Sequence, residues 1–380
     1  MKADAGSRAG RSGRGTGRVT LREVAARAGV SIGTVSNYLS GRARLSGETA
    51  ARVKAAVDEL GYVANAAART LKTGRTMTLT LAVVSLNQPY FAELAEQVIA
   101  AADERGYGVI VQSLGASRAR VEKCVDAARR GVTDGLIVSP TLMGERDARL
   151  FEGTYPLVVL GTQPFEAPAP NITVDNVKAA YDATAHLIRA GRTRIALVGG
   201  EFGPLRNSRS CRAEGYRAAL NDAGLPFDPR LVHGIYDWNS MEGARAVDVL
   251  MEYAPNFDAV LACDDLLALG VMRRLMDRGL RIPDDVRVVG MDDIGQSRYS
   301  VPTLTSVDLG RQNVAVEAVD SLIAQAAAGR RAAPELRYVA HRLICRDSSP
   351  AALGVPGALG SPAAPGEDAG EDTAGRDFKA

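Results

Sequence analysis

Cysteine, histidine and tryptophan are scarce in this chain of 380 residues, which has four, three and one of them. The cysteines, Cys124, Cys211, Cys263 and Cys345, show no C-x-x-C spacing, so neither a disulfide framework nor a zinc site is expected. The histidines are equally dispersed along the chain. We therefore expect no metal and no other cofactor.

Long apolar runs are also missing. No uninterrupted stretch approaches the ~20 residues that a membrane span requires, and the first twenty residues lack the apolar segment of a secretory signal. We therefore expect a cytoplasmic protein without a membrane partner, associated with the nucleoid if it binds DNA.

The overall charge of +2 is unevenly distributed along the chain. Residues 1–75 hold fourteen Lys or Arg against five Asp or Glu, a net charge of +9, which leaves −7 for the rest. An arginine-rich tail supplies part of this excess, but residues 18–75 alone still hold ten basic residues against four acidic ones. A small basic module on a larger acidic body is typical of a protein whose end binds a polyanion.

Residues 18–63 carry three short helical patterns, each with its own start signal. Thr20 opens a T-x-x-E capping box, and Gly29 ends the first helix. Ser31 and Ser46 are the expected N-caps of the second and third helices. The shared core is expected to use Val24, Ala28, Val30, Val35, Leu39, Val53, Val57 and Leu60.

The stretch GVSIG at residues 29–33 matches two different motifs. G-x-S-x-G is the pattern of a hydrolase nucleophile elbow, which needs a strand before the serine. A capped helix precedes Ser31 instead, and no histidine occurs before His186. A helix-turn-helix explains every position, with Gly29 in the turn and Ser31 as a cap.

In a helix-turn-helix, the exposed face of the second helix reads base edges in the major groove. Asn37 can bond an adenine bidentately, while Thr34 and Ser36 suit phosphates or either kind of base. The alternative is a polar, solvated face on a structural three-helix domain, but the surrounding charge favours DNA. The expected DNA-contacting residues of this module, with arginines for the phosphates, are Thr20, Arg22, Ser31, Ile32, Gly33, Thr34, Ser36, Asn37, Tyr38, Arg42 and Arg44.

Residues 64–76 form an alanine-rich linker that is too short to be a stable helix alone. We expect a hinge helix that folds on binding, with Leu71 as an apolar wedge in the minor groove. Alternatively, Leu71 packs onto the next domain. The expected DNA contacts of the hinge are Asn65, Ala68, Leu71 and Lys72.

From residue 77 onward, short apolar strand patterns alternate with longer helical ones. The expected strands are 78–86, 108–114, 135–140, 157–161, 194–200, 259–264 and 286–293. The expected helices are 90–105, 119–130, 176–190, 209–223, 239–253 and 265–278. This alternation predicts an α/β core of two doubly wound, parallel-sheet subdomains, whose ligands lie beyond the carboxyl ends of the strands.

Several stretches are distinctive enough to indicate relatives. The headpiece reads VTLREVAARAGVSIGTVSNYLSG, followed by LSGETAARVKAAVDELGYVANAAARTLKTGRT, and the core contains CDDLLALGVMRRLMDRGLRIPDDVRVVGMDDI and VPTLTSVDL. Over residues 18–349 the chain resembles the LacI/GalR family of bacterial transcription regulators. The resemblance implies a core like type I periplasmic binding proteins, a homodimer on a near-palindromic double-stranded DNA operator, and hinge leucines that intercalate at its centre.

Five departures from the family pattern stand out. Asn37 replaces the usual arginine after TVS, and Ile32-Gly33 replaces a larger polar pair, so the operator half-site is expected to differ. Ala64 stands where the hinge usually begins with proline. Asp264 replaces a frequent asparagine, and an acidic residue is missing near Gly161, so the identity of the ligand stays open.

The expected effector cleft is lined by residues in loops that follow strands. Carboxylates, an arginine and an aromatic ring can fix the hydroxyls of a polyol and stack on its apolar face. By the resemblance, the effector-contacting positions are Arg212, Trp238, Asp264 and Asp292, with Asn87, Tyr90, Phe91, Arg206 and Ser208 as additional lining. Asp265 and Asp293 are either further lining or helix caps. A sugar or sugar derivative is the default effector, and an amine-bearing ligand is the alternative.

The sequence thus predicts a DNA-binding transcriptional regulator, most simply a repressor, that a small metabolite controls through movement of the two core subdomains. A solute-binding protein for uptake is the alternative, and a Rossmann-type enzyme lacks a G-x-G-x-x-G turn after a strand. No enzyme is expected. The expected parts of the chain are disordered tails at 1–17 and 350–380, a headpiece at 18–63, a hinge at 64–76 and a core at 77–349. Within the core, the first subdomain is expected at about 77–174 and 307–333, and the second at about 175–306 and 334–349.

Overall fold

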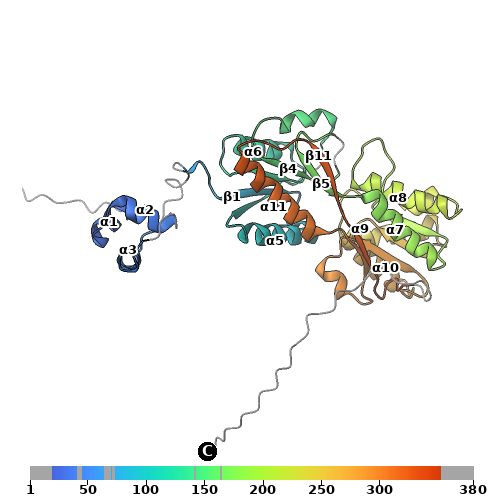
Figure 1. Ribbon diagram of the computed structural model, residues 1–380. Helices are drawn as coiled ribbons and strands as arrows, with labels where there is room; N and C mark the ends of the chain where they lie inside the picture. Colours follow the sequence, from blue (N-terminus) through green and yellow to red (C-terminus); the bar gives the residue numbers. More distant parts are fainter. Residues whose placement is uncertain are drawn as a thin grey trace, which may run out of the picture.

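The computed structural model describes residues 19–40, 45–63, 70, 73–140, 143–162 and 165–351. The predicted tails, and residues 64–69 and 71–72 of the predicted hinge, lie outside this part of the chain, apart from residues 350 and 351. Within it, no helix combines the length and the apolarity needed to cross a membrane. The described elements form a three-helix headpiece and two α/β subdomains (Figure 1).

The headpiece contains three helices, as predicted. They are α1 (Leu21–Ala28), α2 (Ile32–Ser40) and α3 (Gly47–Leu60).

The first subdomain is built on a six-stranded parallel sheet of order β11-β5-β4-β3-β1-β2. Its strands are β1 (Thr78–Val83), β2 (Gly108–Ser113), β3 (Leu136–Val138), β4 (Leu157–Leu160), β5 (Pro170–Val174) and β11 (Glu335–Val339). Its helices are α5 (Pro89–Asp103), α6 (Arg118–Arg129), the 3-10 helix η1 (Glu145–Phe151) and α11 (Arg311–Ala328).

The second subdomain has a six-stranded sheet of order β12-β10-β9-β8-β6-β7, parallel except for the β10–β12 pair. Its strands are β6 (Ile195–Val198), β7 (Val232–His233), β8 (Ala259–Ala262), β9 (Arg287–Met291), β10 (Thr305–Asp308) and β12 (Arg342–Ile344). Its helices are α7 (Asn176–Arg189), α8 (Ser208–Asp222), α9 (Ser240–Tyr253) and α10 (Asp265–Asp277), with the 3-10 helices η2 (Pro229–Leu231) and η3 (Gly295–Arg298).

Both faces of each sheet are buried, which explains the nearly continuous apolar strands. On β1, Leu79, Leu81 and Val83 face the core cluster that includes α5 and α11, whereas Ala82 faces the cluster under α6. The two-residue period of a strand therefore divides its side chains between two helical layers, visible on either side of the sheet in Figure 1.

The chain passes between the subdomains after β5, after β10 and after β11. The prediction that residues 334–349 belong wholly to the second subdomain was wrong. Strand β11 pairs in parallel with β5, from Glu335 opposite Pro170 to Val339 opposite Val174, and only β12 joins the second sheet. The three crossings bring ends of both sheets to one cleft.

Candidate functional site

The first helix of the headpiece begins as predicted. The backbone N–H of Thr20 donates to Glu23 Oε2 at 2.7 Å, and the N–H of Glu23 donates to Thr20 Oγ1 at 3.4 Å. The hydrogen bond from the Thr20 backbone is the main cause of the lowered pKa of Glu23. Gly29 ends the helix in the left-handed region with φ of 65°, a conformation that glycine adopts without strain.

Ser31 caps the second helix and is not a nucleophile at the end of a strand. Its Oγ accepts from the N–H of Thr34 at 3.1 Å and lies 2.9 Å from Thr34 Oγ1. Because α1 precedes the turn, the strand required by a nucleophile elbow is missing. The helix-turn-helix interpretation is confirmed.

One predicted member of the headpiece core was wrong. Val24, Ala28, Val35 and Val53 are buried, but Leu39 is 39% exposed. Residues three and four positions after Val35 both lie near its face of α2, and Tyr38 rather than Leu39 takes the inward position. Further members of the cluster are Ala25, Ala56 and Tyr62, with Val19, Leu21, Val30, Val57 and Leu60 packed against it.

The outer face of α2 is polar and accessible. Ile32, Gly33 and Asn37 are exposed, and Thr34 and Ser36 are half-buried. Arg22 on α1 is exposed as well. The remaining predicted DNA contacts lie outside the described residues; these are Arg42, Arg44, Asn65, Ala68, Leu71 and Lys72.

A second candidate site is an inner chamber of about 120 Å³ between the two subdomains. Seven predicted effector residues line it: Tyr90, Phe91, Ser208, Arg212, Trp238, Asp264 and Asp292. Asp264 and Asp292 follow the carboxyl ends of β8 and β9, where parallel sheets place their ligands. The chamber also receives Gln88, Ser139, Thr173 and Asn176, which the sequence analysis missed.

Arg212 is the central cation of the inner chamber and is only 4% exposed. Its Nε donates to Asn176 Oδ1 at 2.8 Å, its Nη1 donates to the carbonyl of Cys263, and its Nη2 lies 3.9 Å from Asp292 Oδ1. The guanidinium also lies over the Trp238 ring, 5.3 Å from its centroid. These contacts fix the guanidinium and the carboxylate in one orientation.

The two carboxyl groups of the inner chamber are harder to ionise than usual. Burial raises the pKa of Asp264 to about 6 and, together with the nearby Asp264, raises the pKa of Asp292 well above its usual range. Asp264 also caps α10, since its Oδ1 accepts from the N–H of Leu267 at 3.0 Å. Burial raises the pKa of Tyr90 to about 12, so its phenol stays protonated at neutral pH.

Trp238 contributes an aromatic ring to the same chamber. Its Nε1 is buried and has no hydrogen-bond partner among the described residues. Because this atom is enclosed, the ring surface is what Trp238 offers to a bound ligand.

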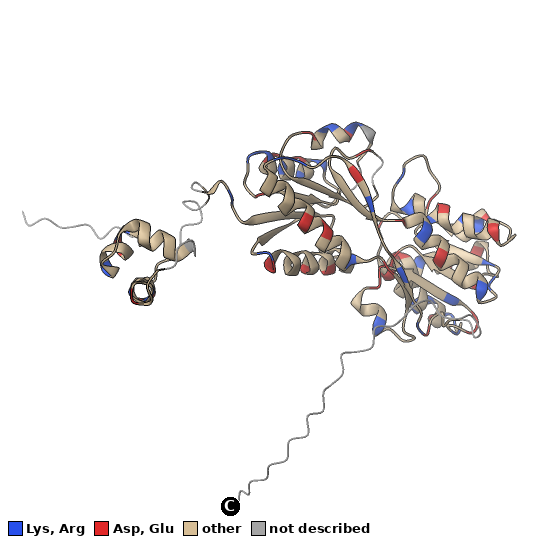
Figure 2. Cartoon of the chain, in the orientation of Figure 1, with Lys and Arg blue, Asp and Glu red and all other residues tan. Residues whose placement is uncertain are grey.

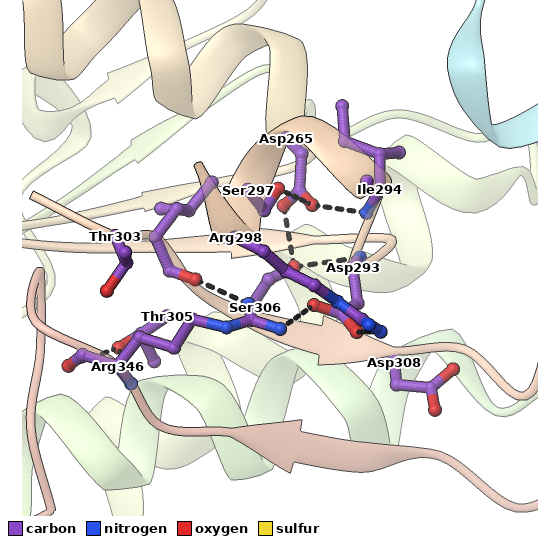
Figure 3. Close-up of polar contacts among 12 residues, drawn as sticks. Asp265, Asp293, Ile294, Ser297, Arg298, Thr303, Thr305, Ser306, Asp308 and Arg346 are labelled. Carbon is purple, nitrogen blue, oxygen red and sulfur yellow. Dashed lines mark hydrogen bonds and ion pairs between the residues drawn. The ribbon is translucent and has the colours of Figure 1, made fainter. Parts of the chain in front are cut away.

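Asp265 and Asp293 are structural and neither is a helix cap. Asp265 is fully buried and accepts from Ser306 Oγ at 2.6 Å, Ser297 Oγ at 2.7 Å and the N–H of Ile294 at 3.0 Å. Asp293 is paired with Arg346 at 2.5 Å (Figure 3). Together they hold the loop after β9, in which Asp292 has φ of 124° and faces the chamber.

Two predicted effector residues do not line the inner chamber. Asn87 is exposed, its backbone N–H donates to Ser85 Oγ at 3.2 Å, and its neighbour Gln88 lines the chamber instead. Arg206 lines a larger outer chamber of about 530 Å³. Both placements have the same cause, because the sequence locates a loop after a strand but not the direction in which each of its side chains points.

The charge on the core is mixed. Figure 2 shows Asp and Glu along α5 and in the middle of α11, with Lys and Arg interspersed over both subdomains. The acidic residues on these two helices include Glu93, Glu96, Asp103, Glu317 and Asp320. In this view, acidic and basic residues are thus intermixed over the described part of the core.

Comparisons with known proteins match both parts of the chain. A family model for bacterial regulatory proteins of the lacI family matches residues 20–65, and one for a periplasmic binding protein-like domain matches residues 184–349. The chain is 35% identical to the HTH-type transcriptional regulator CelR of Thermobifida fusca over 300 residues, which are 77% of this chain and 87% of CelR.

Solved structures with the same fold include two informative complexes. A CelR–cellobiose complex matches with a TM-score of 0.64 and 31% identity, covering 87% of this chain and 100% of that one. The lac repressor dimer bound to operator and the anti-inducer ONPF matches with a TM-score of 0.77 and 25% identity, covering 88% and 100%.

Proposed function

We propose, from the premise that the chain belongs to the LacI family of bacterial regulatory proteins, that it is a transcriptional repressor whose operator binding is switched by a neutral, hydroxyl-rich effector in the inner chamber. As a member of this family it is a DNA-binding transcriptional regulator that acts as a dimer on an operator. The proposed effector is a sugar or sugar derivative, since CelR is known in complex with cellobiose. It acts in the cytoplasm and catalyses no reaction.

The chemistry of the inner chamber supports a sugar. The Trp238 indole offers an apolar ring face, while Asp292 and Asp264 can accept hydrogen bonds from hydroxyls. Arg212 is already engaged with Asp292, so little positive charge is left for an anionic ligand. The two carboxyl groups also disfavour a phosphate. The convergence of Arg212, Asp292 and Trp238 is the observation that carries the proposal.

Both subdomains contribute residues to this chamber. A ligand bound there can therefore control operator binding by the distant headpiece. Tyr90 and Ser139 belong to the first subdomain, and Arg212, Trp238 and Asp292 to the second. A ligand that contacts both sets favours one arrangement of the subdomains over another. In the proposed mechanism this alters the spacing of the two hinges of a dimer, and with it the affinity for the operator.

We assign operator reading to α2. Two headpieces would place Ser31 to Ser40 in successive major grooves, with Asn37 on a base edge and Thr34 and Ser36 on phosphates or bases. Arg22, Arg42 and Arg44 would hold phosphates, and the hinge would insert Leu71 into the minor groove.

Trp238 provides a direct test of the effector proposal, because it is the single tryptophan of the chain. Titration with a panel of neutral sugars is expected to give a saturable change in its fluorescence for the true effector. Asp292→Asn should abolish most of this response, since a carboxylate that accepts from hydroxyls is replaced by an amide of similar size.

The matched control is Asp237→Asn, at an exposed position next to Trp238 that does not line the chamber. It should titrate like the wild type. A response to amino compounds alone would replace the sugar with an amine-bearing effector. Saturable binding that leaves Trp238 fluorescence and the Asp292 variant unaffected would place the effector site elsewhere.

Asn37→Ala is expected to weaken specific operator binding by about 1 to 3 kcal/mol, the value of a bidentate contact to a base. Operator fragments are first recovered by selecting bound genomic DNA, and affinity is then measured on operator and scrambled duplexes at one salt concentration. Binding to scrambled DNA and the circular dichroism of the protein should not change. Lys54→Ala, on the exposed surface of α3, is the control and should affect both duplexes alike. An equal loss on both duplexes for Asn37→Ala would contradict base reading.

A further inference from the structure

The inner chamber encloses more carboxyl groups than cations. Among its lining residues, Arg212 is the one cation, whereas Asp264 and Asp292 are both carboxylic acids. Each of the three residues is at most 5% exposed. Arg212 Nη2 lies 3.9 Å from Asp292 Oδ1, whereas Asp264 forms no ion pair within the described part of the chain, and its Oδ1 accepts from the N–H of Leu267 at 3.0 Å. One buried guanidinium therefore faces two buried carboxyl groups.

The cations next to the chamber already have carboxylate partners. Arg311, at the start of α11, is paired with Glu93 of α5 at 2.7 Å. Arg346 is paired with Asp293 at 2.5 Å. The first residue of α10, Asp265, adds a further buried carboxyl group, which three neutral donors hold (Figure 3). The remaining ionisable groups nearby are Tyr90 on α5, Arg209 on α8, Cys263 after β8, Arg298 in η3 and Asp308 on β10.

Asp264 and Asp292, the carboxyl pair, cannot both ionise as readily as isolated carboxyl groups do. Burial is the main cause, and repulsion between neighbouring carboxylates adds to it. These effects raise the pKa of Asp264 to about 6 and the pKa of Asp292 well above its usual range. Because the two groups interact, the proton belongs to the carboxyl pair and not to one residue. An asparagine at position 264, frequent in the family, would leave Asp292 as the single carboxyl group opposite Arg212.

A neutral ligand strengthens the preference for the protonated carboxyl pair. A sugar in the chamber displaces water that would otherwise solvate the second carboxylate. A protonated carboxyl group can also donate a hydrogen bond to a sugar oxygen, which a carboxylate cannot do.

We propose that the carboxyl pair holds one proton in the effector complex, so that effector binding takes up a proton and weakens as the pH rises through the range in which the free pair ionises. This inference rests on the proposed sugar-responsive function and adds pH control at the same site.

The test uses the full-length protein and the neutral sugar of the panel that gives the largest change in Trp238 fluorescence. Its affinity is measured from about pH 5.5 to 8.5 at constant ionic strength, and it should fall by up to about ten-fold per pH unit once the free pair ionises. Calorimetry at one alkaline pH, in phosphate and in Tris, should give different apparent enthalpies, because these buffers differ in ionisation enthalpy. The difference reports the uptake of up to about one proton per site.

Asp264→Asn separates the shared proton from a merely structural role, because asparagine keeps the N-cap of α10 but leaves one carboxyl group opposite Arg212. The affinity of this variant should vary by less than about two-fold over the same pH range, and its calorimetry should show no proton uptake. The matched control is Asp237→Asn, at an exposed position that does not line the chamber. It should keep the pH dependence of the wild type.

A comparison without ligand tests the carboxyl pair independently of any sugar. Because the folded protein disfavours ionisation of the pair, the wild type loses stability as the pH rises from the usual aspartate range through the raised pKa values. Asp264→Asn lacks this loss, so its melting temperature should rise relative to that of the wild type between about pH 5 and pH 8. Parallel melting temperatures over this range would overturn the inference.

The outcomes with sugar separate this inference from the proposed function. An affinity that is independent of pH in the wild type, or a pH dependence that persists in Asp264→Asn, would overturn the shared proton but not the sugar effector. An affinity that instead rises with pH, for an amine-bearing compound alone, would overturn both. No saturable response to any sugar at any pH would overturn the proposed function and the proton uptake that rests on it.

Discussion

The Arg212→Met variant is expected to lose at least about 100-fold in effector affinity, about 3 kcal/mol, and to bind its operator equally with and without effector. The guanidinium is buried and contacts Asn176, the carbonyl of Cys263, Asp292 and the face of Trp238. Methionine fills a similar volume but supplies none of these hydrogen bonds. The prediction does not depend on whether the effector releases or tightens the operator complex.

Loss of Arg212 also leaves Asp292 buried without its cation. Removing one partner of a buried pair costs about 3 to 5 kcal/mol of stability, so a lower melting temperature is expected alongside the loss of binding. The double variant Arg212→Met with Asp292→Asn separates the two effects, because it removes the unpaired charge. It should recover most of the stability and none of the effector response. Effector-dependent operator binding by the single variant would contradict the assigned role of Arg212.

The sequence alone predicted the structural features that depend on residues close together in the chain. The capping box at Thr20, the turn at Gly29 and the cap at Ser31 all involve residues within a few positions of each other. The buried strands β1, β4 and β8 were recognisable because both of their faces are apolar. Asp264 and Asp292 could be placed at the cleft because they follow such strands directly.

Elements that depend on distant partners were not predicted. Strand β11 reads ELRYV, with charged and exposed residues, and it becomes a strand through pairing with β5, about 165 residues earlier. Strands β5, β7, β10 and β12 were missed as well, and so was helix α11, whose outer surface is only weakly distinguished from its buried one. Asn176 carries no local signal of function, because its importance comes from its hydrogen bonds to Arg212 and, across the subdomains, to Thr162.

Gly270→Ala provides a test in which two physical effects predict changes in stability of opposite sign. Helix propensity alone predicts that alanine stabilises α10 by about 1 kcal/mol. A Cβ at this position, however, would lie 1.9 Å from the carbonyl oxygen of Ser240, at the start of α9. Because a backbone oxygen cannot rotate away, α9 and α10 must separate, and we expect a net loss of about 3 kcal/mol, at the upper end of the usual cost of overpacking.

The same displacement would reach the effector chamber. Trp238 lies two residues before α9 and Asp264 caps α10, so moving the two helices apart separates two walls of the inner chamber. Thermal unfolding of the core should therefore shift downward by about 6 to 12 °C, and effector affinity should fall in the folded variant. Gly203→Ala, in the same subdomain with no atom within 4 Å of the added Cβ, should change stability by less than about 0.5 kcal/mol. An unchanged melting temperature for Gly270→Ala would mean that the two helices are not in close contact, and the position of Trp238 relative to Asp264 would then need another explanation.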